Sequence, residues 1–177
     1  MSAVNLARRV FDTAHLTGTF TLRSGQVSNE YFDKYLFEAE PTLLRAIAEA
    51  MAPMVPAGVE VLAGLELGGI PIVTMLSQVT GLPALFVRKK AKDYGTCRLA
   101  EGGEIDGRQV AVVEDVVTTG GQVLLSCAEL RERGAIVDTV LCVIDREAGG
   151  PEAFAAQGLA LRPLFTMTQL KDAAAAS

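Results

Sequence analysis

Short apolar segments alternate with helical patterns over the last two thirds of the chain. The apolar segments span residues 59–64, 83–87, 109–113, 136–144 and 159–165, and they lack the apolar–polar alternation of a half-exposed strand. Strands that are apolar on both sides belong to parallel sheets covered by helices on both faces. We therefore expect an α/β fold with a central, mainly parallel sheet flanked by helices.

Helical patterns separate these segments and also precede them. We expect helices over residues 5–13, from Pro41 to near Pro53, over residues 69–79 and over residues 121–133. Proline suits a first helical position, and glycines 81 and 134 suit the closing ends. The helix at 121–133 is expected to turn Leu124, Leu125, Ala128 and Leu130 inward. We expect strands or an irregular hairpin at residues 20–37 and a frayed, alanine-rich tail at 171–177.

The composition narrows the function. The chain has 177 residues, half of them hydrophobic, and a net charge of −5, which fits one globular domain. An acidic chain is not expected to bind nucleic acid or an anionic membrane through its overall field. His15 is the sole histidine, so a histidine-based zinc site or a Ser-His-Asp triad is hard to build.

Cysteine usage and hydropathy indicate a cytoplasmic protein. The three cysteines are dispersed and form no Cys-x-x-Cys motif, which favours free thiols in a reducing compartment. The N-terminus lacks the basic-then-apolar pattern of a signal peptide. The longest uncharged run, residues 67–87, contains Pro71, Gly81 and Pro83, and we expect a buried loop, helix and strand there rather than a membrane span.

Polar clusters follow several strands, at the edge where such sheets bind ligands. The most informative is VVEDVVTTGG, residues 112–121, where two acids lie at or just past the end of an apolar strand. Buried carboxylates need partners, and a sugar diol, a metal ion or lysines would serve. The Thr–Gly loop opens a helix, whose N–H groups and dipole favour a phosphate. Either part alone has an ordinary structural explanation, but the ordered combination indicates a phosphorylated ribose.

A basic segment stands out on this acidic chain. Arg88, Lys89, Lys90 and Lys92 fall within five residues and begin a polar, glycine-rich loop that extends to about Gly107. Such a charge run is often a solvated surface. A long loop in a compact domain is also often a lid, and its cations would suit a polyphosphate.

Three further clusters have both a functional and a structural interpretation. GLELGGIP, residues 64–71, offers a second backbone site for an anion or a tightly packed turn. Arg146, in the DRE motif at 145–147, can bind a planar acid or form a surface ion pair. FTLRSGQVSNEYFDK, residues 20–34, mixes aromatic and basic side chains and also fits a plain hairpin.

Together these motifs resemble a known enzyme family. VVEDVVTTGG resembles the phosphoribosyl-diphosphate signature of type I phosphoribosyltransferases, and FTLRSG, GLELGGIP, VRKKAKDYG and VIDRE resemble the orotate phosphoribosyltransferases. The resemblance covers about residues 16–150. It implies the type I phosphoribosyltransferase fold in one domain spanning residues 1–177, with a small N-terminal hood at about 1–40 and a core at about 41–170. It also implies Mg²⁺-dependent transfer of phosphoribose from its diphosphate to orotate in pyrimidine (UMP) synthesis.

The resemblance further implies roles for individual residues. Glu114 and Asp115 would hold the ribose hydroxyls and oppose the positive charge of an oxocarbenium-like transition state, and Lys92 would assist the leaving diphosphate. These three are the expected catalytic residues. The expected diphosphate-sugar site comprises Arg23, Arg88, Lys89, Lys92, Tyr94, Glu114, Asp115, Val116, Val117, Thr118, Thr119, Gly120, Gly121 and Gln122. The expected orotate contacts are Tyr31, Phe32, Thr118 and Arg146. Mg²⁺ would be held mainly by the substrate diphosphate and water, with no direct protein ligand.

The resemblance also implies a homodimer, in which loop 88–104 reaches the neighbouring site. The chain departs from many relatives at Arg23 (often Lys), Tyr94 (often His) and Gly68 (Lys in some), and from some at Glu114 (Asp). Two alternatives stay open: a transferase for another base, and a phosphoribosyl-diphosphate-binding regulator. A regulator would need an added domain or a basic surface for nucleic acid, for which 177 residues at −5 leave little room.

Overall fold

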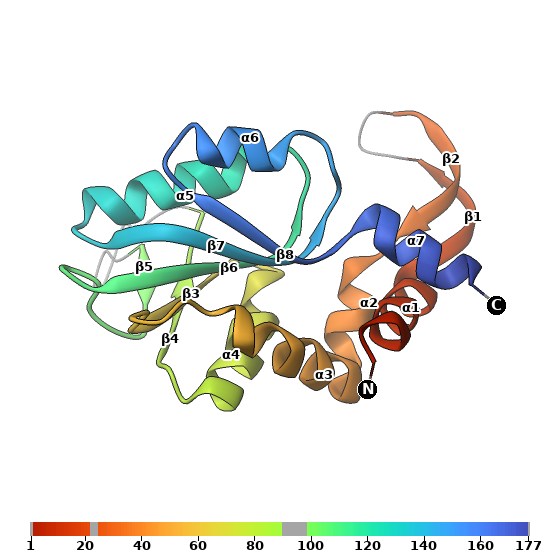
Figure 1. Cartoon of the computed structure of the whole chain (residues 1–177). Coiled ribbons are helices and arrows are strands. Elements are labelled where there is room, and N and C mark those ends of the chain that lie inside the picture. The colour runs from red at the N-terminus through yellow and green to blue at the C-terminus, as the bar shows by residue number, and fades with distance from the viewer. Residues whose placement is uncertain (1, 22–24, 90–98, 177) are drawn as a thin grey trace.

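The computed structural model describes residues 2–21, 25–89 and 99–176 and shows a six-stranded sheet between two layers of helices (Figure 1). The strand order is β5-β4-β3-β6-β7-β8. Five strands are parallel: β3 (Val61–Leu65), β4 (Ala84–Val87), β6 (Gln109–Val117), β7 (Ile136–Asp145) and β8 (Ala160–Thr166). The short edge strand β5 (Ala100–Glu101) is antiparallel to β4. The expected α/β class and mainly parallel sheet are confirmed.

Helices cover both faces of the sheet, which explains why its central strands are largely apolar. Helices α3 (Pro41–Met51), followed by the 3-10 turn η1 (Ala52–Met54), and α4 (Gly69–Thr80) cover one face, and α5 (Gly121–Glu132) and α6 (Gly150–Ala155) cover the other (Figure 1). Along β7, Leu141 belongs to the apolar cluster on the α3–α4 side, whereas Val140 belongs to the cluster on the α5–α6 side. Successive side chains of a strand point to opposite faces of the sheet. A strand that is covered on both faces therefore carries apolar residues at consecutive positions.

The N-terminal hood combines a helix, a hairpin and a second, short helix. Helix α1 (Ala3–Ala14) leads into β1 (His15–Thr21) and β2 (Val27–Phe32), which pair antiparallel, and then into α2 (Lys34–Ala39). The predicted hairpin is confirmed, but residues 34–37 are helical rather than extended. Asp33 explains the change, because its carboxylate accepts a hydrogen bond from the Tyr35 N–H at 3.1 Å and caps the new helix.

The C-terminal helix α7 (Met167–Ala175) packs against α1, so the hood is built from both ends of the chain (Figure 1). Thr166 and Gln169 form a capping box at its start, and Leu170 and Ala173 are buried. The prediction of a frayed tail is therefore wrong for residues 171–175. Alanine has the highest intrinsic helix propensity, and here the helix also gains apolar contacts.

Three local expectations need correction. Strand β6 continues to Val117, so the two acids lie within a strand that pairs with β7 and not beyond its end. Helix α5 turns Val123, Ser126, Cys127 and Leu130 inward, whereas Leu125 is 61% exposed. The described part of the expected polar loop contains strand β5, and Leu99 and Ile105 on either side of this strand are buried in the core.

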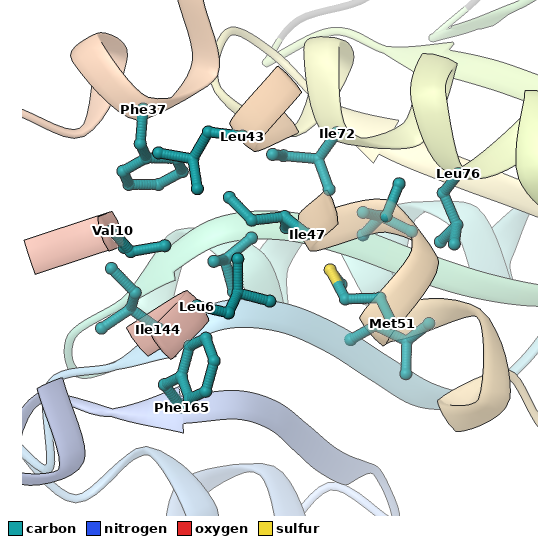
Figure 2. Close-up of a cluster of buried hydrophobic side chains, with 14 of the residues drawn as sticks. Leu6, Val10, Phe37, Leu43, Ile47, Met51, Ile72, Leu76, Ile144 and Phe165 are labelled. Atoms are coloured by element: carbon teal, nitrogen blue, oxygen red, sulfur yellow. The ribbon is translucent and has the colours of Figure 1, made fainter. Parts of the chain in front are cut away.

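The hood joins the core through a shared apolar cluster (Figure 2). Val10 of α1, Phe37 of α2, Ile47 of α3 and Ile144 of β7 are all fully buried there. Burial of one such side chain stabilises a fold by roughly 1.5–3 kcal/mol. The hood is therefore held firmly beside the carboxyl ends of the strands.

Candidate active site

The two acids of β6 lie in different surroundings. Glu114 is partly exposed, whereas Asp115 has no accessible surface. The Asp115 N–H donates to Glu114 Oε1 at 2.9 Å, and the Val116 N–H donates to Asp115 Oδ1 at 2.5 Å. The two carboxyl groups therefore differ in exposure, although a hydrogen bond joins their side chains.

Glu114 faces a cup formed by the loop between β6 and α5. The cup has a volume of about 310 Å³ and is lined by Glu114 and residues 116–123. Gly120 precedes the helix with φ 79°, and an added Cβ would lie 2.2 Å from Phe154 Cε2, so only glycine fits there. The free N–H groups at the start of α5 and the two threonine hydroxyls suit a phosphate. All predicted residues from Val116 to Gln122 therefore gather at one cup.

The start of the basic segment lies on the other side of Glu114. Arg88, Lys89, Glu66, Glu114 and Gln122 line a second, narrow hollow. The Lys89 N–H donates to Glu66 Oε1 at 2.6 Å, which joins the basic segment to the GLELGG turn. The structure thus brings two predicted cations beside the acid. Arg23, Lys92 and Tyr94 lie outside the described residues.

A separate cleft brings together three predicted orotate contacts. Tyr31 and Phe32 of the hood and Arg146 after β7 line a cavity of about 230 Å³. Three other polar residues lie there that the sequence did not single out: Ser28, Glu30 and Lys171. The Arg146 N–H donates to the Val117 carbonyl at 2.8 Å and so ties this cleft to the cup. Thr118, the fourth predicted contact, lines the cup.

Asp115 points away from the cup, towards helix α2. Lys34 Nζ lies 2.6 Å from Asp115 Oδ2, and an added Cβ at Gly68 would lie 1.5 Å from the same oxygen. Burial would raise the pKa of Asp115, but hydrogen bonds with Glu114 and Lys34 outweigh it and lower the pKa. Burial, strengthened by a hydrogen bond with Asp115, raises the pKa of Glu38 well above its ordinary value.

Lys34 and Glu38 are the residues that the sequence did not identify. A lysine was one possible partner for the acids, and Lys34 closes the FTLRSGQVSNEYFDK motif. The sequence pattern predicts strands or a hairpin up to residue 37, whereas the structure begins a helix at Lys34 that turns this side chain towards β6.

The pKa of Glu114 is also raised, first by burial and then by a hydrogen bond with Asp115. A neutral Glu114 can both donate to and accept from a hydroxyl pair. A positive charge arriving nearby would favour its ionised form. The cup therefore combines a phosphate loop with a carboxyl group that responds to charge.

Comparison with known proteins identifies the family. No family model matches the chain. It is 55% identical to a Nocardioides orotate phosphoribosyltransferase over 169 residues, which are 96% of this chain and 94% of the relative. The chain belongs to the orotate phosphoribosyltransferase family. A member from Methanocella arvoryzae is 45% identical over 86% of the chain and 87% of its own length.

Solved structures agree with this orotate phosphoribosyltransferase assignment. The Mycobacterium tuberculosis orotate phosphoribosyltransferase bound to inorganic phosphate matches with a TM-score of 0.85 and 30% identity, over 96% of this chain and 98% of that one. Its structure in complex with 5-phospho-α-D-ribosyl 1-diphosphate matches with a TM-score of 0.82, also at 30% identity. The type I phosphoribosyltransferase fold expected from the sequence is confirmed.

Two kinds of feature are absent from the described part of the chain. Within residues 2–21, 25–89 and 99–176, no three His, Cys, Asp or Glu side chains gather as a metal site would require. In the same part of the chain, no helix is long and apolar enough to cross a membrane.

Proposed function

We propose that this chain transfers the 5-phosphoribosyl group from phosphoribosyl diphosphate to orotate, giving orotidine 5′-phosphate and diphosphate. One observation carries the proposal: a phosphate-type cup with a carboxyl group and a cleft with an arginine meet at one sheet edge. The Arg146–Val117 backbone hydrogen bond joins them. A ribose 5-phosphate in the cup would direct its C1′ atom towards a base in the cleft.

In this proposal the cup holds the part of the substrate that is transferred. The loop at 118–122 binds the 5′-phosphate through backbone N–H groups and threonine hydroxyls. Glu114 binds the ribose hydroxyls. As the ribose ring gains positive charge in the transition state, the ionised carboxylate stabilises that charge. A preorganised group of this kind typically contributes roughly 3–4 kcal/mol to transition-state stabilisation.

The cleft selects the base. Arg146 can bind the planar, anionic edge of orotate through its fork of donors, and the rings of Tyr31 and Phe32 can pack against the base. The Tyr31 and Phe20 rings already lie 5.5 Å apart, which fixes one wall of the cleft. Thr118, at the junction with the cup, would contact both substrates.

The described residues suit a Mg²⁺ ion held mainly by the substrate. Asp115 is enclosed and paired with Lys34, which leaves Glu114 as the acidic side chain on the cup. Mg²⁺ commonly keeps several waters and binds substrate phosphates with few carboxylates. When bound it would supply positive charge to the diphosphate, beside Arg88 and Lys89.

We further propose a homodimer in which loop 88–104 acts across the interface, with Lys92 as the main cation for the leaving diphosphate. The motif resemblance supports this role, and Lys92 itself lies outside the described residues. Lys92→Ala should lower turnover by about two orders of magnitude or more while far-ultraviolet circular dichroism stays unchanged. A loss below about threefold would reject the role.

Sharing of the site between subunits has its own test. Mixed dimers of Lys92→Ala and Glu114→Gln subunits should regain activity, because one of their two sites would combine intact residues. Mixed dimers that stay inactive after confirmed subunit exchange would contradict a shared site.

We also propose that the protein works in the reducing environment of the cytoplasm. Cys127 and Cys142 are buried free thiols, and burial raises the pKa of Cys127 to about 12, so its thiol is unreactive. Both residues can keep their reduced form as parts of the core.

The deciding experiment is an absorbance assay of orotate consumption with phosphoribosyl diphosphate and Mg²⁺. We expect turnover with orotate and none with uracil or purine bases. Turnover with another base instead would replace the substrate assignment. No turnover with any base would favour the regulator.

A further inference from the structure

Helix α2 places Lys34 and Glu38 on one face, because residues four apart in a helix lie on the same side. Phe37 is fully buried and lies close to Leu43 in the core (Figure 2). Lys34 Nζ lies 2.6 Å from Asp115 Oδ2. Glu38, one turn further along the helix, is 6% exposed, and burial together with its interaction with the same carboxylate raises its pKa. The apolar anchor therefore fixes where the two polar side chains meet strand β6.

The contacts enclose the Asp115 carboxylate. Oδ1 accepts the Val116 N–H at 2.5 Å, and Oδ2 lies 2.6 Å from Lys34 Nζ and against the backbone of Gly68. Asp115 has no exposed surface, and Glu38 is only 6% exposed. Both oxygens of this carboxylate therefore have partners inside the protein.

We infer that Lys34 and Glu38 are positioning residues, which hold Asp115 and thereby hold the end of β6 and the ribose–phosphate cup in their binding geometry. The inference rests on the proposed binding of a ribose phosphate in the cup. Asp115 is followed directly by the strand end and the loop at 118–122, and preceded by Glu114. A shift of Asp115 would therefore move both walls of the cup, and misplacement by about 1 Å can cost about 100-fold in rate.

Strand alternation explains why this task falls to Asp115 and not to Glu114. Glu114 faces the cup, so a partner on that side would occupy the ligand site. Asp115 faces the hood, where a cation can be held permanently without blocking the cup. Gly68 makes the approach possible, because any side chain there would overlap the carboxylate.

The test measures ribose 5-phosphate binding by calorimetry, since this probe occupies the cup without any base. Lys34→Met should weaken binding by about tenfold or more, and Lys34→Arg should regain most of the loss because it keeps the cation. Arg45→Met is the matched control: it removes an exposed ion pair with Glu49 and should leave binding unchanged. Glu38→Gln keeps a hydrogen-bonding group and should bind the probe more tightly than Glu38→Leu.

A double-mutant comparison separates positioning from general stability. If Lys34 acts through Asp115, adding Lys34→Met to Asp115→Asn should change the dissociation constant by less than about threefold. Losses that multiply would overturn the inference. This comparison remains possible if Lys34→Met alone fails to fold, because the double variant leaves no unpaired charge.

Failure of the inference and failure of the proposed function give different results. Wild-type turnover with orotate tests the base and does not involve these variants. Unaltered ribose 5-phosphate binding by folded Lys34→Met would reject the positioning role even if orotate turnover is normal. Wild-type protein that does not bind ribose 5-phosphate would reject the cup itself.

Discussion

Glu114 and Asp115 are adjacent in the chain, yet they belong to two different regions of the molecule. Glu114 lines an open cup with the phosphate-type loop, whereas Asp115 is enclosed by Lys34, Glu38 and Gly68. The open side has groups free for a ligand, and the enclosed side has its charge already paired. Two adjacent carboxyl groups can thus have different surroundings, one lining the cup and the other paired between the hood and the core.

The largest expected effect is on the enclosed side. Asp115→Ala should lower the free energy of unfolding by about 3 kcal/mol, because it leaves Lys34 without its buried partner. The loss of stability is no larger because the Lys34 side chain is 34% exposed and its ammonium group can be hydrated when Asp115 is removed. Urea denaturation measures the change. Asp12→Ala removes a surface pair with Arg8 and is the control, with an expected loss below about 1 kcal/mol.

A change at Glu114, on the open side, should lower activity much more than stability. Glu114→Gln should lower turnover by about 100-fold, equivalent to about 2.7 kcal/mol of transition-state stabilisation, while its unfolding midpoint stays near that of the wild type. Steady-state kinetics and thermal unfolding measure the two effects. A variant that unfolds as readily as Asp115→Ala but keeps its turnover would reverse the assignment of the two sides.

The fit between Gly68 and Asp115 gives a third test. Gly68→Ala should destabilise the protein by about 2 kcal/mol, because the new Cβ would overlap Asp115 Oδ2 and force a shift. Gly121→Ala is a matched control for stability, since no atom lies within 4 Å of its added Cβ. Equal unfolding midpoints for the two alanine variants would contradict the close packing at Gly68.

The smallest expected effect concerns pH. The pKa of Glu38 is raised from 4.5 to about 9, so the folded protein keeps a proton that the unfolded chain releases. Its contribution to stability is present below pH 4.5 and is lost as the pH rises towards the folded value, by no more than about 1.4 kcal/mol per pH unit. Glu38→Gln removes this loss.

The Glu38→Gln variant should therefore gain stability relative to wild type between pH 5 and pH 8, by about 1 kcal/mol after proton sharing with its neighbours. Thermal unfolding across this range measures the gain. The exposed Glu49→Gln control should show a much smaller pH dependence. A gain that grows towards pH 5 would have the wrong sign for a protonated Glu38.

The sheet and the cup could be predicted because their signals are local. Apolar strands, the Gly–Thr turn and the helix after it are continuous in the chain, so their pattern predicts both the α/β class and the gathering of residues 116–122 at one cup. The prediction went wrong where neighbours outside the segment decide the outcome. Helix α5 was predicted with Leu125 inward, but its contact with the sheet selects Val123 and Cys127 instead. The tail was predicted to fray because its contact with α1 was not foreseen.

By itself the sequence determined the architecture, the order of the motifs and the family, because backbone periodicity and motif spacing are properties of short segments. Only the tertiary structure decided the division between the two acids. Lys34 and Asp115 are far apart in the chain, and they meet because Phe37 packs in the core and holds helix α2 beside strand β6, an arrangement that no local pattern reports. Packing of the hood against the sheet leaves Glu114 on the cup and pairs Asp115 with Lys34 inside the protein.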